Sequence, residues 1–179
     1  MRIVGGKYKG RIFNPGKKFS ARPTTDLAKE ALFNILANRY DLSEMRILDL
    51  FSGTGSIGYE FISRNAGEVI FVESNSNHVR FIKEVLEKLE IKNARIVRED
   101  VFRFLKFTPE KYDLIFADPP FNAPFINEIP ETVFNSRVVN DNGLLILEHP
   151  GNLDFSHHLH FIELRKYGKV NFSFFNAIE

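Results

Sequence analysis

The chain of 179 residues contains no cysteine. This absence excludes disulfide bridges, thiolate nucleophiles, and zinc or iron–sulfur sites with cysteine ligands. No apolar stretch approaches the ~18 residues of a membrane-spanning helix, and the N-terminus lacks the apolar region of a signal peptide. We therefore expect a cytoplasmic protein without a membrane partner. Since 44% of the residues are hydrophobic and 26% are charged, we also expect a soluble domain with a sizeable core.

The net charge of +1 is unevenly distributed along the chain. Residues 1–30 contain eight basic and two acidic side chains, a net charge of +6, so the remaining 149 residues carry about −5. A basic segment on a mildly acidic body indicates contact with a polyanion. A solvated N-terminus is the plainer alternative.

The hydrophobic pattern predicts alternating helices and strands after a first segment of short extended pieces and glycine turns. Thr24 or Thr25 can cap the first helix, which runs to about Arg39 and presents Lys29 on its polar face. The other predicted helices cover residues 56–64, 75–89, 101–106 and 125–135, and the predicted strands cover residues 46–51, 68–73, 94–98, 112–117 and 143–148. Two last strands, 158–167 and 170–176, have no helix between them, which predicts an antiparallel hairpin at the end of a mostly parallel sheet.

Asp118-Pro119-Pro120-Phe121 is the most informative motif, and it directly follows the predicted strand 112–117. Two consecutive prolines fix φ and remove two backbone donors, so their carbonyls are available to a ligand. Between a carboxylate and an aromatic ring they form a slot that can accept N–H groups and stack a nucleobase. A purely structural turn is the alternative. The position at the end of a strand, where open α/β sheets bind ligands, favours a site.

A glycine-rich turn, Gly53-x-Gly55-x-x-Gly58, lies between a predicted strand and a predicted helix. Glu73 follows Gly53 by twenty residues, a spacing typical of dinucleotide sites. The glycines let a cofactor approach the backbone, and an acid that ends the next strand can accept from ribose hydroxyls. Any adenosine-containing cofactor could use both, and a merely tight turn is a third interpretation.

Three observations favour S-adenosylmethionine over NAD. Asp49 and Phe51 line the strand end before the glycine turn, and an acid there suits an ammonium group better than a pyrophosphate. Asp100, followed by Val101, ends the third strand with an acid that can accept from the adenine amine. The Asp118 motif ends the fourth strand, where a dehydrogenase has no evident need for an amine-accepting slot.

These motifs, with others that run nearly end to end, resemble those of the bacterial small-subunit 16S rRNA guanine-N2 methyltransferases, which are class I enzymes. The resemblance is carried by the segments 1–11 (MRIVGGKYKGR), 22–26 (RPTTD), 30–34 (EALFN), 49–55 (DLFSGTG), 71–73 (FVE) and 118–121 (DPPF). Ser52 and Thr54 stand where the family often has Ala and Ser. The resemblance implies an α/β fold with a three-layer, Rossmann-like methyltransferase sheet. It also implies a basic RNA-binding arm or hairpin over residues 1–24 and a catalytic domain over residues 25–179.

The resemblance further implies methyl transfer from S-adenosylmethionine to the N2 amine of a guanine in 16S rRNA, without a metal. Asp118 and the Pro119 carbonyl would accept from the amine, Pro120 would keep the loop rigid, and Phe121 would stack on the base. The predicted cofactor residues are Asp49, Phe51, Gly53 and Gly55 for methionine, Glu73 for ribose, and Ser74, Asp100 and Val101 for adenine. Phe71 and Phe102 are candidates to pack on adenine, although core packing is the plainer interpretation.

The predicted RNA contacts lie near the N-terminus. Phosphates would be bound by Arg2, Lys7, Lys9, Arg11, Arg22 and Lys29, with the hydroxyls of Thr24 and Thr25 near the base. Such contacts set affinity and register without reading sequence. The target guanine would be unpaired or flipped, within a small-subunit assembly particle, and the enzyme would act as a monomer.

Two alternatives use the same residues differently. An N6-adenine or protein-glutamine methyltransferase could use the same slot, although those enzymes usually carry Asn first and Tyr last in the motif. A non-catalytic RNA-binding module could have kept the fold. His157-His158-x-His160 has no acid or cysteine at ligand spacing, so we do not expect a metal site there.

Overall fold

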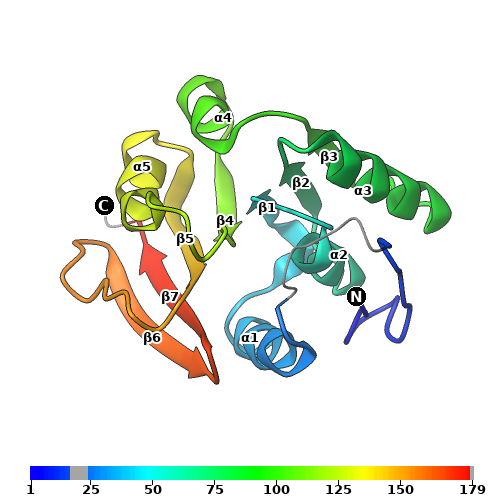
Figure 1. Ribbon diagram of the computed structural model, residues 1–179, viewed down its shortest axis with the longest axis horizontal. Coiled ribbons are helices and arrows are strands. Elements are labelled where there is room, and N and C mark those ends of the chain that lie inside the picture. Colours follow the sequence, from blue (N-terminus) through cyan, green and yellow to red (C-terminus); the bar gives the residue numbers. More distant parts are fainter. Residues whose placement is uncertain (17–23, 178–179) are drawn as a thin grey trace.

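The computed structural model describes residues 1–16 and 24–177, which build a seven-stranded sheet in the order β3-β2-β1-β4-β5-β7-β6 (Figure 1). The strands are β1 Arg46–Leu50, β2 Glu68–Val72, β3 Ala94–Val97, β4 Tyr112–Ala117, β5 Val139–His149, β6 Phe161–Tyr167 and β7 Val170–Asn176. Strands β1 to β5 are parallel, and β7 is antiparallel to both β5 and β6. The predicted mostly parallel sheet with a C-terminal antiparallel hairpin is confirmed.

Helices cover both faces of this sheet and make three layers (Figure 1). The helices are α1 Asp26–Arg39, α2 Ser56–Ser63, α3 Ser76–Lys88, α4 Val101–Phe107 and α5 Ile129–Asn135, with 3-10 turns η1 Leu42–Glu44 and η2 Ile126–Glu128. Helices α1, α2 and α3 pack on one face, and α4 and α5 on the other. The last predicted helix, 125–135, is divided into η2 and α5, with Pro130 in the first turn of α5, where its missing N–H is not needed. Across residues 1–16 and 24–177, no helix is long and apolar enough to cross a membrane.

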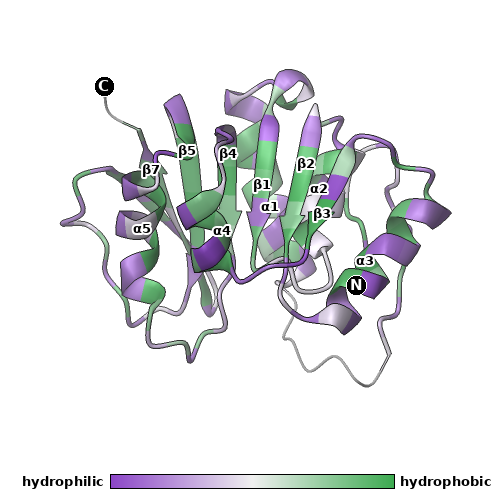
Figure 2. Cartoon of the chain, turned by 90° about the horizontal axis from the view of Figure 1, so that it is seen from above, coloured by the Kyte–Doolittle hydropathy of each residue, from purple (hydrophilic) through white to green (hydrophobic). Residues whose placement is uncertain are grey.

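Two hydrophobic clusters, one on each face, hold the layers together. Successive strand residues point to opposite faces, so Ile47 and Phe116 pack under α1, α2 and α3, whereas Leu48 and Ala117 pack under α4 and α5. The central strands are apolar almost throughout, as Figure 2 shows, because both of their faces are covered. Each fully buried large side chain contributes roughly 1.5–3 kcal/mol to folding.

The sheet order places the glycine turn and the Asp118 motif next to each other. The chain leaves β1 through α2 to β2 on one side and returns from β3 through α4 to β4 on the other side of β1. The strand order therefore reverses between β1 and β4. Ligands in open α/β sheets bind at such a switch point, at the carboxyl ends of the strands. The glycine turn follows β1, and Asp118-Pro119-Pro120-Phe121 follows β4.

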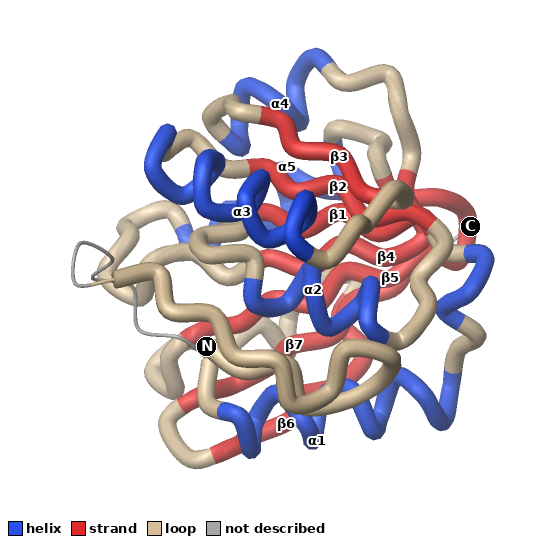
Figure 3. The backbone as a smooth tube through the Cα atoms, turned by 90° about the vertical axis from the view of Figure 1, so that its right-hand side faces the viewer, coloured by secondary structure: helices blue, strands red, loops and turns tan. Residues whose placement is uncertain are grey.

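Residues 1–16 are docked on the outer side of α2 (Figure 3). An antiparallel bridge joins Arg2 to Ile12, which confirms short extended pieces around the glycine turns. The Lys7 N–H donates to the Ser63 carbonyl at 2.6 Å. Gly6 has φ +71, and a Cβ there would lie 1.8 Å from that carbonyl oxygen, so this close approach requires glycine. The division into an arm (1–24) and a domain (25–179) stays a prediction.

Two strand boundaries differ from the prediction by more than one residue. The strand expected from His158 begins at Phe161, because the His158 N–H donates to Phe155 and the Phe161 N–H to His158, which makes a turn. His158 and His160 therefore do not share a strand face. Strand β5 begins at Val139, four residues before the predicted start at Gly143, through a pairing of Val139 with Tyr112 that precedes an irregularity in the register.

Candidate active site at the carboxyl edge of the sheet

The turn between β1 and α2 brings backbone to the surface at the switch point. Phe51, Gly53 and Gly55 have φ values of +57, +54 and +80. A Cβ on Gly55 would lie 2.8 Å from the Tyr59 ring, so glycine is required there. Phe51 adopts a conformation that aromatic residues rarely take, and such outliers concentrate at functional sites. The Ser52 hydroxyl donates to the Asp49 carbonyl at 2.6 Å and fixes the turn.

Glu73 connects this turn to the loop after β2. Its two carboxylate oxygens accept from the Gly53 N–H at 2.8 Å and from the Asn75 N–H at 2.7 Å. A carboxylate has about four lone-pair positions, so two further donors can be accommodated. Glu73 thus keeps capacity for the hydroxyls of a ribose.

Asp49 is a buried carboxylate with no cationic partner among the described residues. Its Oδ2 accepts from the Gly58 N–H at 3.1 Å. Burial raises the pKa of Asp49 to about 8, the Gly58 N–H opposes this shift, and the charge of Glu73 adds to it. A buried acid that lacks a counter-charge fits the ammonium group of a ligand.

The residues predicted for adenine follow β2 and β3 at the same edge. Ser74 is exposed and directly follows Glu73. Asp100 caps α4 by accepting from the Arg103 N–H at 3.0 Å, and Val101 is buried below it. The structure therefore brings all eight predicted cofactor residues to the carboxyl ends of three neighbouring strands.

Three phenylalanines gather beside the glycine turn. Phe51 stacks on Phe125 with ring centroids 6.0 Å apart, and Phe102 meets Phe125 edge-on at 5.0 Å. Phe102 is half-buried at this edge, whereas Phe71 is fully buried against Tyr59, in agreement with the core interpretation of Phe71. Sequence reasoning missed Phe125, since nothing in the motif four residues earlier points to it.

The Asp118 motif forms a tight loop directly after β4, beside the end of β1. The Asp118 N–H donates to the Leu50 carbonyl at 3.4 Å, and the Ala123 N–H donates to the Pro120 carbonyl at 2.8 Å. Pro119 is buried, Pro120 is exposed, and 37% of Phe121 is exposed. The aromatic ring is thus available for stacking.

Asp118 lies in an acidic environment. Burial raises the pKa of Asp118 well above its usual value, and the charges of Glu148 and Asp49 raise it further. Glu148 is the penultimate residue of β5, is 3% exposed, and accepts from the Thr24 hydroxyl at 2.7 Å. Sequence reasoning missed Glu148, although the strand was predicted to end there, which is where the other site acids lie.

Four of the predicted RNA contacts are exposed on residues 1–16. These are Arg2, Lys7, Lys9 and Arg11, while Arg22 lies outside the described residues. Arg2 is paired with Asp26 at 2.8 Å. The Tyr8 hydroxyl donates to the Leu89 carbonyl at 3.3 Å, so this tyrosine is packed against the residue that follows α3.

The prediction that Lys29 faces solvent and contacts phosphate is wrong. Lys29 is 1% exposed, because residues 1–4 and α2 enclose the start of α1. Its ammonium donates to the Arg2 carbonyl and to the Ser56 hydroxyl, and it lies 3.8 Å from Glu60. Thr24 is also buried, with its hydroxyl on Glu148, whereas Thr25 caps α1 by accepting from the Ala28 N–H at 3.2 Å.

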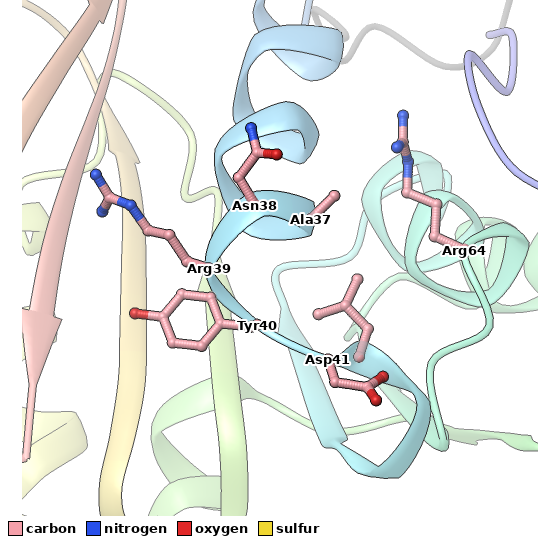
Figure 4. A pocket seen from close by; sticks show the side chains of 7 residues that line it. Ala37, Asn38, Arg39, Tyr40, Asp41 and Arg64 are labelled. Carbon is pink, nitrogen blue, oxygen red and sulfur yellow. The ribbon is translucent and has the colours of Figure 1, made fainter.

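A hollow of about 510 Å³ lies at the C-terminal end of α1 (Figure 4). It is lined by residues 37–42 and by Arg64. Because α1 ends there and η1 leads into the start of β1, this hollow is at the amino edge of the sheet and apart from the site. Within the described part of the chain, no cluster of three or more His, Asp or Glu side chains is arranged to hold a metal ion.

The sheet order, the glycine turn with its acid, and the Asp118 loop at the switch point define a class I methyltransferase fold. Residues 1–176 match the family described as Conserved hypothetical protein 95, and the chain belongs to that family. It is a methyltransferase.

Named relatives and solved structures cover most of the chain. It is 31% identical to ribosomal RNA small subunit methyltransferase D of Buchnera aphidicola, over 86% of this chain and 78% of that protein. Identity with the Escherichia coli K12 protein of the same name is 30%, over 83% and 74%. A hypothetical protein from Thermus thermophilus superposes with a TM-score of 0.87 at 30% identity, over 99% of both chains. The Escherichia coli protein yhhF gives a TM-score of 0.86 at 27% identity, over 98% and 97%.

Proposed function

We propose that this methyltransferase transfers a methyl group from S-adenosylmethionine to the exocyclic N2 amine of a guanine in 16S rRNA. The observation that carries the proposal is the position of Asp118-Pro119-Pro120-Phe121 beside the glycine turn at the switch point of the sheet. The relatives named as ribosomal RNA small subunit methyltransferase D support RNA as the substrate.

The residues at the carboxyl edge fit S-adenosylmethionine, which supplies a methyl group already activated by a sulfonium. Asp49, buried without a counter-charge, would bind the ammonium of the methionine part, next to the backbone of the glycine turn. Glu73 would accept from the ribose hydroxyls, and Ser74, Asp100 and Val101 would hold the adenine. Phe51, Phe102 and Phe125 would exclude water from the reacting atoms.

The guanine amine is a poor nucleophile because its lone pair is delocalised into the ring. The Asp118 carboxylate and the Pro119 carbonyl would accept from its two N–H groups and aim the lone pair at the methyl group. Phe121 would stack on the base, a contact worth roughly 1–3 kcal/mol. Catalysis is then mostly in-line positioning, and Asp118 takes the proton late.

The exposed basic side chains of residues 1–16 would hold the RNA backbone. They lie along α2, which has 8 residues and a length of about 12 Å. Arg2 is near the carboxyl edge, since its carbonyl is held by Lys29 beside Ser56, whereas Lys7 is near Ser63 at the far end of α2. This spread suits phosphates on both sides of one unpaired guanine. We further propose that the substrate is a small-subunit assembly particle and that the enzyme acts as a monomer in the cytoplasm.

Transfer of a radiolabelled methyl group to small-subunit particles tests this function. We expect the label in RNA, as N2-methylguanosine after digestion to nucleosides. Label in N6-methyladenosine or in protein would establish one of the rival methyltransferase activities. Binding of RNA without any transfer would establish the non-catalytic alternative.

A further inference from the structure

Glu148 is a buried acid that the proposed mechanism does not use. In the parallel pairing of β4 with β5, Phe116 is opposite Ile146 and Ala117 is opposite Leu147. The next positions of the same register are Asp118 and Glu148. Neighbouring strands lie about 4.8 Å apart and alternate residues share a face, so the two carboxyl groups leave the sheet side by side on the face that α1 covers.

Among the described residues no cation adjoins this pair, and the further charge that acts on Asp118 is that of Asp49. Beyond Glu148, β7 contributes Phe172, which does not ionise. Beyond Asp118, β1 contributes Asp49. His149 is turned away, with its ring nitrogens 2.8 Å from the Ser173 hydroxyl and 2.9 Å from the Pro150 carbonyl.

Thr24, just before α1, supplies the one described hydrogen bond to Glu148, at 2.7 Å from hydroxyl to carboxylate. A donor of this kind favours the charged form of the acid. Burial raises the pKa of Glu148 to about 7, and the Thr24 hydroxyl opposes this shift. Asp118 has no such donor among the described residues, and burial raises its pKa well above the usual value. The hydrogen bond from Thr24 therefore favours Glu148 as the charged member of the pair.

We propose that Glu148, kept charged by Thr24, is a positioning residue that makes Asp118 a stronger base for the proton that the substrate amine loses. In that step the amine nitrogen forms its bond to the methyl carbon, and the carbon–sulfur bond breaks with its electron pair going to sulfur. The nitrogen's proton passes to the Asp118 carboxylate. A charged neighbour makes Asp118 hold that proton more tightly, and a catalytic base works best when its pKa is near the working pH.

This inference rests on the proposed function and is tested with Glu148→Gln, which keeps an acceptor for Thr24 but removes the charge. We expect the acidic limb of the kcat profile to move to lower pH by roughly one unit, with a several-fold lower plateau and KM for the cofactor within about twofold. Glu148→Asp should restore the wild-type limb. Asp141→Asn, at the exposed amino end of the same strand, is the matched control and should change neither.

Carbon-13 NMR titration of the Asp118 carboxyl gives a second readout that needs no substrate, and its midpoint should fall in Glu148→Gln. Thr24→Val should shift both readouts in the same direction by less, which keeps the test available if Glu148→Gln does not fold. An active wild-type enzyme whose limb and titration midpoint are unchanged in these variants would overturn this inference alone. Failure of the wild type to methylate guanine would instead overturn the proposed function, while the titration would still test the pairing.

Discussion

Asp118 is the residue on which methyl transfer should depend most. No described residue donates a hydrogen bond to its side chain, and the neighbouring acids raise its pKa further. We expect Asp118→Asn to lower kcat by roughly 10²- to 10⁴-fold, the usual contribution of a positioned base. Cofactor affinity, measured by calorimetry, should stay within about twofold. Asp141→Asn serves as the control, and turnover near wild type in Asp118→Asn would remove Asp118 from the mechanism.

Asp49 should have opposite effects on binding and on stability. Asp49→Asn removes the carboxylate that would accept a charge-assisted hydrogen bond from the cofactor's ammonium group. We therefore expect cofactor affinity to fall about tenfold or more, equivalent to roughly 1.5–3 kcal/mol. In the cofactor-free protein the pKa of Asp49 is raised from 3.8 to about 8, so the variant should match wild-type stability near pH 4 and exceed it by a growing margin as pH rises toward 8. Calorimetry and thermal unfolding check the two effects, and unchanged affinity would place the ammonium elsewhere.

At the scale of elements, the docking of residues 1–16 on α2 depends on Gly6. In Gly6→Ala the new methyl group would collide with the Ser63 carbonyl. We expect weaker RNA binding with a smaller salt dependence, because the basic side chains lose their fixed position. Gly10→Ala is a matched control, since Gly10 also has positive φ but nothing within 4 Å of its added Cβ. Equal RNA affinity in the two variants would show that docking does not matter for RNA.

Lys29 and Glu60 hold the same segment from inside. Glu60 accepts from the Val4 N–H and from Arg64, and Lys29 spans Arg2 and Ser56. Removing one partner of a buried ion pair typically costs about 3–5 kcal/mol, so we expect Lys29→Met to lower the free energy of unfolding by about that amount. Urea unfolding measures it, with the exposed Lys83→Met as control. A loss below about 1 kcal/mol would mean that the pair contributes little.

Elements that form from local pattern could be predicted from the sequence. The helix after Thr25 and the apolar strand Tyr112–Ala117 were placed within a few residues, and acids that end strands pointed to one edge of the sheet. Lys29 could not be placed correctly, because in its own helix it belongs to the polar side. Its burial comes from residues 1–4 and α2, and the pairing of Glu148 with Thr24 likewise joins residues 124 positions apart. Such contacts are set by tertiary packing, which periodicity does not report.

For the whole molecule, we expect stability to be greatest in mildly acidic solution. Asp49, Glu148 and Asp118 bind protons more tightly when folded than when unfolded, so the free energy of unfolding should fall as pH rises from about 5 through the folded pKa values of about 7 and 8. At the other end, the hydrogen bond from Arg95 lowers the pKa of Glu110 to about 2, so that contribution is lost as pH falls below about 4.5.

Urea unfolding of the cofactor-free protein between pH 3 and pH 9 measures this dependence. Asp49→Asn should flatten the alkaline decline, because one of the three acids is then uncharged at every pH. Stability that rises between pH 6 and pH 9 would show that these acids have counter-charges in the folded protein.

The chemistry of the whole molecule is tested most directly by nucleoside mass spectrometry of 16S rRNA after incubation of unmethylated small-subunit particles with the enzyme and S-adenosylmethionine. We expect N2-methylguanosine with the wild-type protein and none with Asp118→Asn. N6-methyladenosine in the RNA, or no new methylated nucleoside with a folded protein that binds the cofactor, would contradict guanine-N2 transfer in the Asp118-Pro119-Pro120-Phe121 slot.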